Sequence, residues 1–280
     1  MIYVSISSLS HLGLKNAIDL VCRHGIKNIE LSGAFPYYDG IDKDLRTLQK
    51  FHRLNLICHN YFPHPKIPFI INLASLNDNI YQRSLSFLKE AIALSKKIES
   101  PKFGFHAGFF VDITIDEIGK TVKYKELSDQ KKSIQRFTEA WDELQAESDG
   151  VELYIENNVL SFNNYKTFHH QNPLMLTTLE EYRELKKNID FELLLDVAHL
   201  KVSAHSLGLN FIEEFQGLIS QTDYVHLSDN DGFSDQNKSF NQSSDLWNLL
   251  DLADLNKKTI TLEIYENINN IKNTYDLLSK

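Results

Sequence analysis

The segment LLLDVA, residues 193–198, is the clearest of several short apolar runs in this 280-residue sequence. Three leucines precede a single aspartate, which is typical of a strand buried in a parallel sheet. Seven further runs of at most eight residues are similarly rich in apolar, β-branched or aromatic side chains. They are Ile2–Ser7, Asn28–Ser32, Leu56–Phe62, Lys102–Phe109, Glu152–Asn157, Asp223–Ser228 and Thr259–Tyr265. The sequence therefore predicts eight strands.

Between these runs, apolar residues recur at helical spacing, and this alternation predicts βαβ units with parallel strands. The stripes are Leu14, Ile18, Val21 and Cys22; Leu85, Leu88, Ile92 and Ser95; Ile134, Phe137, Trp141 and Leu144; and Leu246, Leu249, Leu250 and Ala253. Eight units in 280 residues give a repeat of about 35, as a (β/α)8 barrel requires. A doubly wound sheet is the alternative, but no Gly-rich dinucleotide turn follows the first strand.

Composition narrows the class of protein. With 42% hydrophobic and 24% charged residues, the chain matches an ordinary globular protein rather than a disordered one. No linker or composition break divides it, so we expect an α/β fold, a single-domain TIM barrel over residues 1–280. The net charge of −9 argues against a nucleic-acid partner. Apolar runs are too short for a membrane helix and no signal peptide is evident, so we expect a cytoplasmic protein without a membrane partner.

Polar, metal-competent side chains lie at or near the carboxyl ends of six consecutive predicted strands. They are His59, His106, Glu156, Asp196, His226 and Glu263. A buried carboxylate in an apolar strand costs several kcal/mol unless it is paired or bound to a cation. Any one of them could be an ion-paired or hydrogen-bonded interior residue, but six at successive strand ends are hard to obtain by accident. In a barrel these ends form a ring, so the side chains should converge.

Four of these residues predict a divalent-metal site, namely Glu156, Asp196, His226 and Glu263. Three carboxylates with one imidazole suit Mn²⁺, Mg²⁺ or Co²⁺, and we expect Mn²⁺ first. Added imidazoles from His59, His106 and His199 would favour Zn²⁺ instead.

Further residues near these strand ends are candidates for binding substrate: His199, Lys201, His59, His106 and Asn60. A solvated role for Lys201 and a turn-capping role for Asn60 are the alternatives. Three connections after strands are longer than a barrel needs and are candidate lids over the catalytic face. They are Pro63–Asn77, Phe110–Lys131 and Val159–Thr177.

Seven motifs on or beside the predicted strands resemble those of the xylose-isomerase-like TIM barrels. They are IELSG (29–33), HNYF (59–62), FHAGF (105–109), IENN (155–158), LLLDVAH (193–199), HLSDNDG (226–232) and LEIY (262–265). This superfamily contains sugar isomerases and epimerases, inosose dehydratases and AP endonucleases. The resemblance covers essentially all eight strands.

The ketose 3-epimerases of this group hold one divalent ion with Glu, Asp, His and Glu on strands five to eight. The resemblance assigns these roles to Glu156, Asp196, His226 and Glu263, and a substrate contact to His199. Two substrate-binding positions differ. A Glu of those enzymes falls here on Phe162, and an Arg falls on Gly232. Both departures argue against a ketose 3-epimerase in the strict sense.

The AP endonucleases use a larger, trinuclear zinc set. The resemblance places His59, His106, Glu156, Asp196, His199, His226 and Glu263 in that set. Asp235 matches the Asp of a further Asp-x-His pair, but the His falls on Asn237, a poor metal ligand. The resemblance therefore implies an incomplete third zinc site.

The leading hypothesis is a divalent-metal-dependent isomerase or epimerase of a sugar, polyol or sugar phosphate. Glu156 or Glu263 would abstract the proton beside the carbonyl to form an enediolate, and the other would return a proton. The alternatives are an inosose-type dehydratase, a zinc-dependent phosphodiesterase of the AP endonuclease type, and a non-enzymatic sugar-binding barrel. Barrels of this group are often dimers or tetramers, so a homo-oligomer is also expected.

Overall fold

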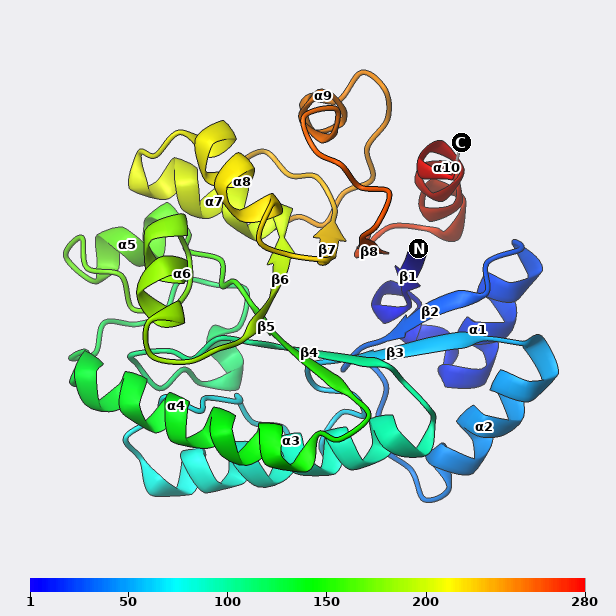
Figure 1. Cartoon of the computed structure of the whole chain (residues 1–280), viewed down its shortest axis with the longest axis horizontal. Helices are drawn as coiled ribbons and strands as arrows, with labels where there is room; N and C mark the ends of the chain where they lie inside the picture. The colour runs from blue at the N-terminus through cyan, green and yellow to red at the C-terminus, as the bar shows by residue number, and fades with distance from the viewer. Residues whose placement is uncertain (280) are drawn as a thin grey trace.

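In the computed structural model, which describes residues 1–279, eight parallel strands close into one barrel in the order β1 to β8 (Figure 1). The strands are β1 Ile2–Ser5, β2 Asn28–Leu31, β3 Asn55–His59, β4 Lys102–His106, β5 Glu152–Glu156, β6 Glu192–Asp196, β7 Tyr224–Leu227 and β8 Thr259–Leu262. Ile2 pairs with Ile260, which closes the ring between the first and last strands. The predicted single-domain (β/α)8 barrel is confirmed.

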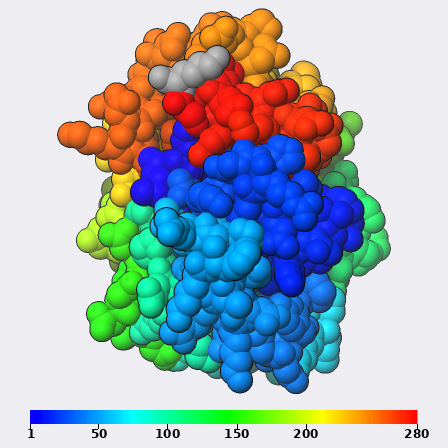
Figure 2. All heavy atoms as spheres, turned by 90° about the vertical axis from the view of Figure 1, so that its right-hand side faces the viewer, coloured from blue at the N-terminus to red at the C-terminus, as the bar shows by residue number. Residues whose placement is uncertain are grey.

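Helices surround the strands as an outer ring (Figure 1). They are α1 Leu14–Arg23, α2 Ile41–His52, α3 Asp78–Lys97, α4 Gln130–Glu147, α5 Phe162–Thr167, α6 Leu179–Lys186, α7 Val197–Leu207, α8 Phe211–Ile219, α9 Asp245–Leu250 and α10 Ile268–Leu278, with 3₁₀ turns η1 Ser7–Leu12 and η2 Ile115–Glu117. Figure 2 shows the earliest and latest parts of the chain side by side, as closure of the barrel requires.

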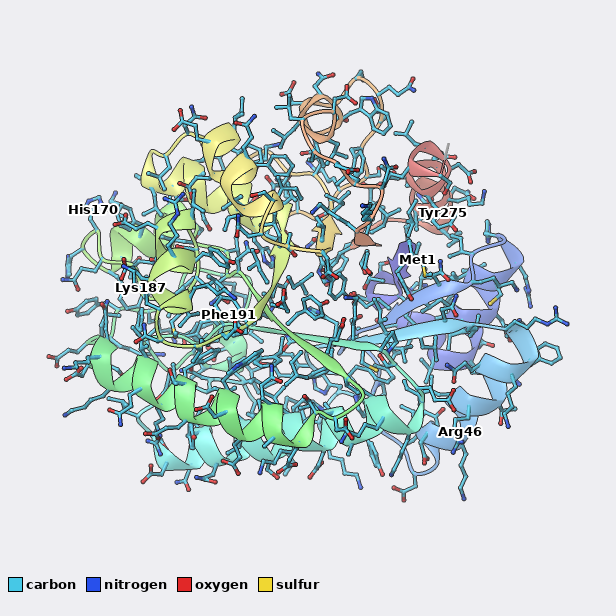
Figure 3. The ribbon with its side chains drawn as sticks, viewed as in Figure 1. Met1, Arg46, His170, Lys187, Phe191 and Tyr275 are labelled. Carbon is cyan, nitrogen blue, oxygen red and sulfur yellow. The ribbon has the colours of Figure 1, made fainter. Side chains whose placement is uncertain are left out.

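The apolar stripes of the helices bury against the barrel. Phe137, Trp141 and Leu144 of α4 are each at most 2% exposed. Phe191, labelled in Figure 3, leads into β6 and packs its ring against Trp141 and against Tyr182 of α6. One predicted stripe is too long, because α9 ends at Leu250 and leaves Ala253 outside the helix.

Alternation along each strand separates the interior of the barrel from the layer under the helices. Tyr3, Ile57, Tyr154, Leu194 and Tyr224 form a buried cluster of their own, in register with the inward side of their strands. Residues two positions further on in several strands point the same way and lie beyond this layer. The packed layer therefore forms the floor under the polar strand ends.

The predicted runs overshoot the strands at their carboxyl ends. β4 ends at His106 rather than Phe109, and β8 ends at Leu262, so Glu263 is the first residue after its strand. These extra residues begin the loops above the barrel. Among residues 1–279, no helix combines the length and apolar character that a bilayer crossing requires.

Candidate metal centre and active site

Four of the predicted ligands converge at the carboxyl end of the barrel. Glu156 and Asp196 are the last residues of β5 and β6, His226 lies in β7, and Glu263 follows β8. One ligand atom from each residue lies within 4.8 Å of those of the other three. All four are at most 8% exposed. The residues that the sequence singled out for a metal site thus share a common point.

The imidazole of His226 lies among the three carboxylates. Its Nδ1 is 3.1 Å from Glu263 Oε2, 3.4 Å from Glu156 Oε1 and 3.9 Å from Asp196 Oδ2. Each acidic side chain therefore has one oxygen within 4 Å of the same ring nitrogen. This arrangement provides four donor atoms of two chemical kinds around a small volume.

Two buried acceptors of the cluster lack hydrogen-bond donors. Within residues 1–279, no donor reaches Glu156 Oε1 or Asp196 Oδ2, although both atoms are shielded from solvent. Such an atom costs free energy unless a cation or a donor compensates it. Three carboxylates and one imidazole are ligands that Mn²⁺, Mg²⁺ and Co²⁺ accept. The residues present therefore fit a divalent cation.

The electrostatics of the cluster point in the same direction. Burial raises the pKa of Asp196, because the charged form is desolvated and Glu156 and Asp235 lie nearby. Burial also opposes charge on Glu156, but His106 and His59 overcome it and hold the pKa of that carboxyl well below its usual range. The imidazoles near Asp196 thus stabilise its ionised form too little to offset burial. A divalent cation would favour the ionised form of both.

Two further predicted histidines contact Glu156 from the other side. His59 Nε2 lies 2.8 Å and His106 Nδ1 3.1 Å from Glu156 Oε2. His199 Nδ1 is 3.8 Å from the other oxygen, Oε1. Glu156 is therefore the residue around which both the acidic ligands and the additional imidazoles are arranged.

The strand–helix junction after β6 explains how Asp196 and His199 are positioned. Asp196 caps α7, because its Oδ1 accepts a hydrogen bond of 2.7 Å from the backbone N–H of His199. The side chain of Asn157 holds the backbone on both sides of Asp196, donating to the Asp196 carbonyl at 3.0 Å and accepting from the Asp196 N–H at 2.7 Å. The Asn157 carbonyl lies 2.9 Å from His199 Nδ1. The three-residue spacing of Asp and His thus follows from the first turn of a helix.

A cavity of about 350 Å³ opens beside the cluster. Glu263, His59, His106 and Asn60 line it, so three predicted substrate-binding residues and one predicted base face the same space. Two of the three candidate lids complete its wall. The first contributes His64, Pro68 and Phe69, and the second contributes Ile115 and Ile118.

Lys201 lies apart from this group. Its ammonium donates to Asp229 Oδ1 at 2.8 Å and to the carbonyl of Asn230 at 2.6 Å. These partners belong to the loop after β7, so the lysine ties α7 to that loop. Its predicted contact with substrate stays a prediction.

The structure shows the surroundings of the two positions that depart from the ketose 3-epimerase pattern, Gly232 and Phe162, and of Asn237, which departs from the AP endonuclease pattern. Gly232 has φ +82°, and a Cβ there would lie 2.1 Å from His205 Nδ1, so no larger side chain fits without movement. Phe162 begins α5 and is 51% exposed. Asn237, where a zinc-binding His would stand, donates to Asp235 Oδ2 at 3.1 Å, and that oxygen lies 3.4 Å from His199 Nε2.

Two residues of this region were not among the sequence predictions. Glu30 of β2 is fully buried and lies 2.9 Å from His226 Nε2. Tyr265 donates its hydroxyl to Glu263 Oε1 at 2.9 Å. Glu30 stands between Ile29 and Leu31 in a strand, which is the same anomaly that singled out Glu156. That signal would have found Glu30, whereas nothing local marks Tyr265.

A second, larger groove of about 760 Å³ lies between the loop after β2, the loop after β3 and α3. It shares His64 and Phe69 with the cavity described above, but none of the four clustered ligands lines it. The smaller cavity, in contrast, is lined by Glu263 of the cluster together with His59 and His106.

A family model described as "Xylose isomerase-like TIM barrel" matches residues 18–277. The chain belongs to this family. Membership confirms the resemblance found in the sequence motifs. A search of curated proteins found no match.

Solved structures of the xylose isomerase-like fold resemble this chain over almost its whole length. A D-tagatose 3-epimerase-like protein is 16% identical with a TM-score of 0.73, and the match covers 99% of this chain and 95% of that one. D-psicose 3-epimerase from Clostridium cellulolyticum H10 is 14% identical, with a TM-score of 0.64 and coverages of 99% and 89%. The E. coli 3-keto-D-glucoside 4-epimerase is 10% identical, with a TM-score of 0.65 and coverages of 99% and 97%. At these identities the likeness establishes the fold.

Proposed function

We propose that this protein is a divalent-metal-dependent isomerase or epimerase of a sugar, polyol or sugar phosphate. The observation that carries the proposal is the convergence of Glu156, Asp196, His226 and Glu263 within 4.8 Å, with two carboxylate oxygens lacking donors. The solved relatives support it, because those compared above are named as sugar epimerases or as epimerase-like. The substrate class is accordingly a small carbohydrate.

Glu156, Asp196, His226 and Glu263 would hold the cation, with Mn²⁺ our first candidate and Co²⁺, Mg²⁺ or Zn²⁺ the alternatives. When bound, a divalent cation supplies Lewis acidity and stabilises negative charge developing on substrate oxygens.

The two glutamates are the proposed acid–base pair. Glu263 lines the cavity, and its pKa is lowered because contact with His226 outweighs the effect of burial, so it is ionised and able to accept a proton. It would remove the proton beside the carbonyl, and the C–H electrons would form the double bond of an enediolate. The π electrons of the carbonyl would move to its oxygen. Glu156, ionised at rest, would take a proton from solvent and return it to the carbon, while Glu263 releases its own proton to solvent. Delivery from the opposite face yields the epimer.

The remaining predicted residues would orient the substrate. His59, His106 and Asn60 line the cavity, and His199 lies within 4 Å of Glu156 and Asp196. Asn60 is fixed at the end of β3 by a hydrogen bond of 2.6 Å from its N–H to the Gly104 carbonyl. These groups would hydrogen-bond substrate hydroxyls while Ile115 and Ile118 exclude water. Fixed positions of this kind lower the entropic part of the barrier.

A dehydratase of the inosose type is one alternative, since it begins with the same proton abstraction. It would be distinguished by the loss of one water from the product. The exchange experiment below records this difference directly, because the product mass falls by one water.

A zinc-dependent phosphodiesterase is the second alternative, and one observation favours it. His59 and His106 both approach Glu156 Oε2, while Oε1 faces His226, so these two imidazoles together with Glu156 would be the residues to hold a second ion. This function predicts at least two Zn²⁺ per chain and cleavage of abasic DNA that is weakened by added salt. The proposed isomerase predicts one ion per chain.

The test is a panel of ketoses, aldoses, polyols and their phosphates, incubated in D₂O with the protein and Mn²⁺, Co²⁺, Mg²⁺ or Zn²⁺. We expect one substrate to convert to an isomer or epimer that carries deuterium at the reacting carbon. Glu181→Gln is the control variant and should keep the activity. The carboxylate of Glu181, in α6, accepts hydrogen bonds from Thr177 and Asn172 and lies away from the cluster. Absence of both conversion and exchange across the panel would contradict the proposal.

A further inference from the structure

The two nitrogens of His226 face different environments. Nδ1 faces Glu156, Asp196 and Glu263, whereas Nε2 lies 2.9 Å from Oε2 of Glu30 on β2. Both His226 and Glu30 are fully buried. The ring therefore stands between the proposed metal ligands and a carboxylate deeper in the barrel.

The other partners of Glu30 determine where the proton of this contact lies. Its Oε2 also accepts hydrogen bonds from the hydroxyls of Tyr224 and, at 2.8 Å, of Thr261. An oxygen that already accepts two donors is an acceptor toward the ring as well. His226 Nε2 must then carry a hydrogen and donate it to Glu30. When the ring gives up one proton to bind a cation, the proton that stays is the one on Nε2, and the lone pair is then on Nδ1, facing the cluster.

The contact also fixes the orientation of the ring. Glu30, Tyr224 and Thr261 come from β2, β7 and β8, and the hydrogen bonds run across the barrel interior. With Nε2 held from this side, Nδ1 points at the common volume. A ligating histidine whose other N–H is fixed by a carboxylate is both oriented and made a stronger donor.

We infer that Glu30 is a positioning residue for the metal centre, acting through His226, which it holds in the Nε2–H form with Nδ1 free for the cation. This inference rests on the proposed metal site. Glu30 does not touch the proposed cation or the substrate. Its effect should therefore appear first in metal affinity rather than in the chemistry of the bound substrate.

The first experiment measures Mn²⁺ affinity of the metal-stripped full chain by competition with a chelating dye. Removal of such an outer carboxylate costs about 10–100-fold in metal affinity, so Glu30→Ala should weaken binding by that factor. Glu30→Gln should restore part of the loss, because its amide oxygen can still accept the Nε2–H. Unchanged affinity in folded Glu30→Ala would overturn the inference.

Thr261→Val is the matched control. It removes one hydrogen bond to the same oxygen of Glu30 but leaves the contact with His226 intact. We expect Mn²⁺ to bind this variant nearly as tightly as the unmodified chain. A loss equal to that of Glu30→Ala would mean that general damage to the barrel interior, rather than the imidazole contact, sets the affinity.

A second readout separates this inference from the proposed function. In histidine labelled with ¹⁵N, the Nε2–H of His226 should give a downfield proton signal that exchanges slowly with water, with or without Zn²⁺. The signal should disappear in Glu30→Ala, and its absence from the unmodified chain would overturn the inference. If the unmodified chain binds no metal at all, the proposed function fails while the signal still tests the role of Glu30.

Discussion

Strand β5, with the sequence ELYIE, carries a glutamate at each end, and the two have opposite environments. The side chain of Glu152, at the amino end of the barrel, is 66% exposed and lies 2.9 Å from the ammonium of Lys102. Glu156, at the carboxyl end, is fully buried, and its ion-pair partners among residues 1–279 are all imidazoles. The two glutamates of this strand thus differ in environment: Glu152 forms an exposed ion pair with a lysine, and Glu156 is a buried carboxylate among imidazoles.

The amino end is balanced by the protein itself. Lys102 also lies 3.3 Å from Asp223, and the Tyr154 hydroxyl donates to that carboxylate at 2.8 Å. At the carboxyl end, no Lys or Arg of residues 1–279 forms an ion pair with Glu156, Asp196 or Glu263. The described part of the chain thus supplies a permanently charged lysine at the amino end and no Lys or Arg partner for these carboxylates at the carboxyl end. The amino end is therefore balanced within the protein, whereas the carboxyl end fits the cation that we propose.

The sharpest test of this comparison replaces each glutamate of β5 in turn. Glu156→Gln should lower turnover by about 10²–10⁴-fold, because a proposed proton-transfer group is lost, and Glu263→Gln should do the same. Glu152→Gln should turn over substrate at nearly the unmodified rate. The measurement is the initial rate of conversion with Mn²⁺. Near-normal activity in Glu263→Gln would defeat the proposed acid–base assignment.

Metal removal should lower the free energy of unfolding, and this effect should depend on the proposed ligands at the carboxyl end of the barrel and not on residues at the amino end. Mn²⁺ at 100 times its Kd should raise the free energy of unfolding by about 2.7 kcal/mol over the metal-free protein. Urea denaturation with Mn²⁺ or with a chelator measures the difference. Asp196→Asn should lose most of this gain, whereas Glu152→Gln should keep it. An equal gain in both variants would place the ion elsewhere.

The pH dependence of the metal-free protein should also reflect the carboxyl end. Burial lowers the pKa of His226, but Glu30 and the surrounding carboxylates outweigh it and hold that pKa well above its usual range. Burial raises the pKa of Asp196 to about 7. Both groups bind protons more tightly in the folded state. Their stabilising contribution is therefore complete at low pH and is lost as the pH rises through the folded pKa values.

We therefore expect the free energy of unfolding of the metal-free protein to fall as the pH rises from about 4 through about 7, where folded Asp196 loses its proton, and to go on falling above about 6.5, where His226 begins to contribute. The slope is about 1.4 kcal/mol per pH unit for each additional proton that the folded state holds. Saturating Mn²⁺ should flatten this fall, because the cation replaces the protons. Urea titrations at several pH values measure both curves. Carboxyls with lowered pKa values, such as Glu263, lose their contribution only at lower pH. A flat metal-free curve would contradict the prediction.

The smallest effect is expected at the amino end. Lys102→Met removes the ammonium, but Glu152 and Asp223 are 66% and 57% exposed and can be solvated by water. The loss in unfolding free energy should be about 0.2–1 kcal/mol, as for other ion pairs at the surface. Mn²⁺ affinity, measured by chelator competition, should be unchanged. Weakened metal binding in this variant would show that the two ends are coupled.

The sequence predicted the fold well, because each strand is buried on both faces and its apolar character is local. Each of the eight runs overlaps a strand. Two strands, β3 and β6, begin one residue before their run, and the carboxyl ends of the runs were placed up to three residues too far along. Phe109 and Tyr265 are apolar or aromatic loop residues that continue the strand pattern by composition alone. Backbone pairing, which ends at His106 in β4, depends on the neighbouring strand. The composition of a segment does not show where its neighbouring strand ends.

The candidate site was predictable for the same local reason. Glu156 and Asp196 stand out as charges that end apolar strands, and closure of the barrel then brings such ends together. The partners of Lys201 were not predictable, since Asp229 and Asn230 reach it only through the loop after β7. The two hydrogen bonds between the Asn157 side chain and the backbone of Asp196 were not predictable either.

By itself, the sequence determined the order of strands and helices and the chemical type of the residue at each strand end, because both are written in patterns a few residues long. Only the tertiary structure decided how those residues are held. Glu30 and His226 are 196 residues apart and meet because the ring of strands is closed across its interior. Contacts across a closed barrel depend on the register and curvature of every strand between the two residues. A pattern a few residues long does not specify either of them.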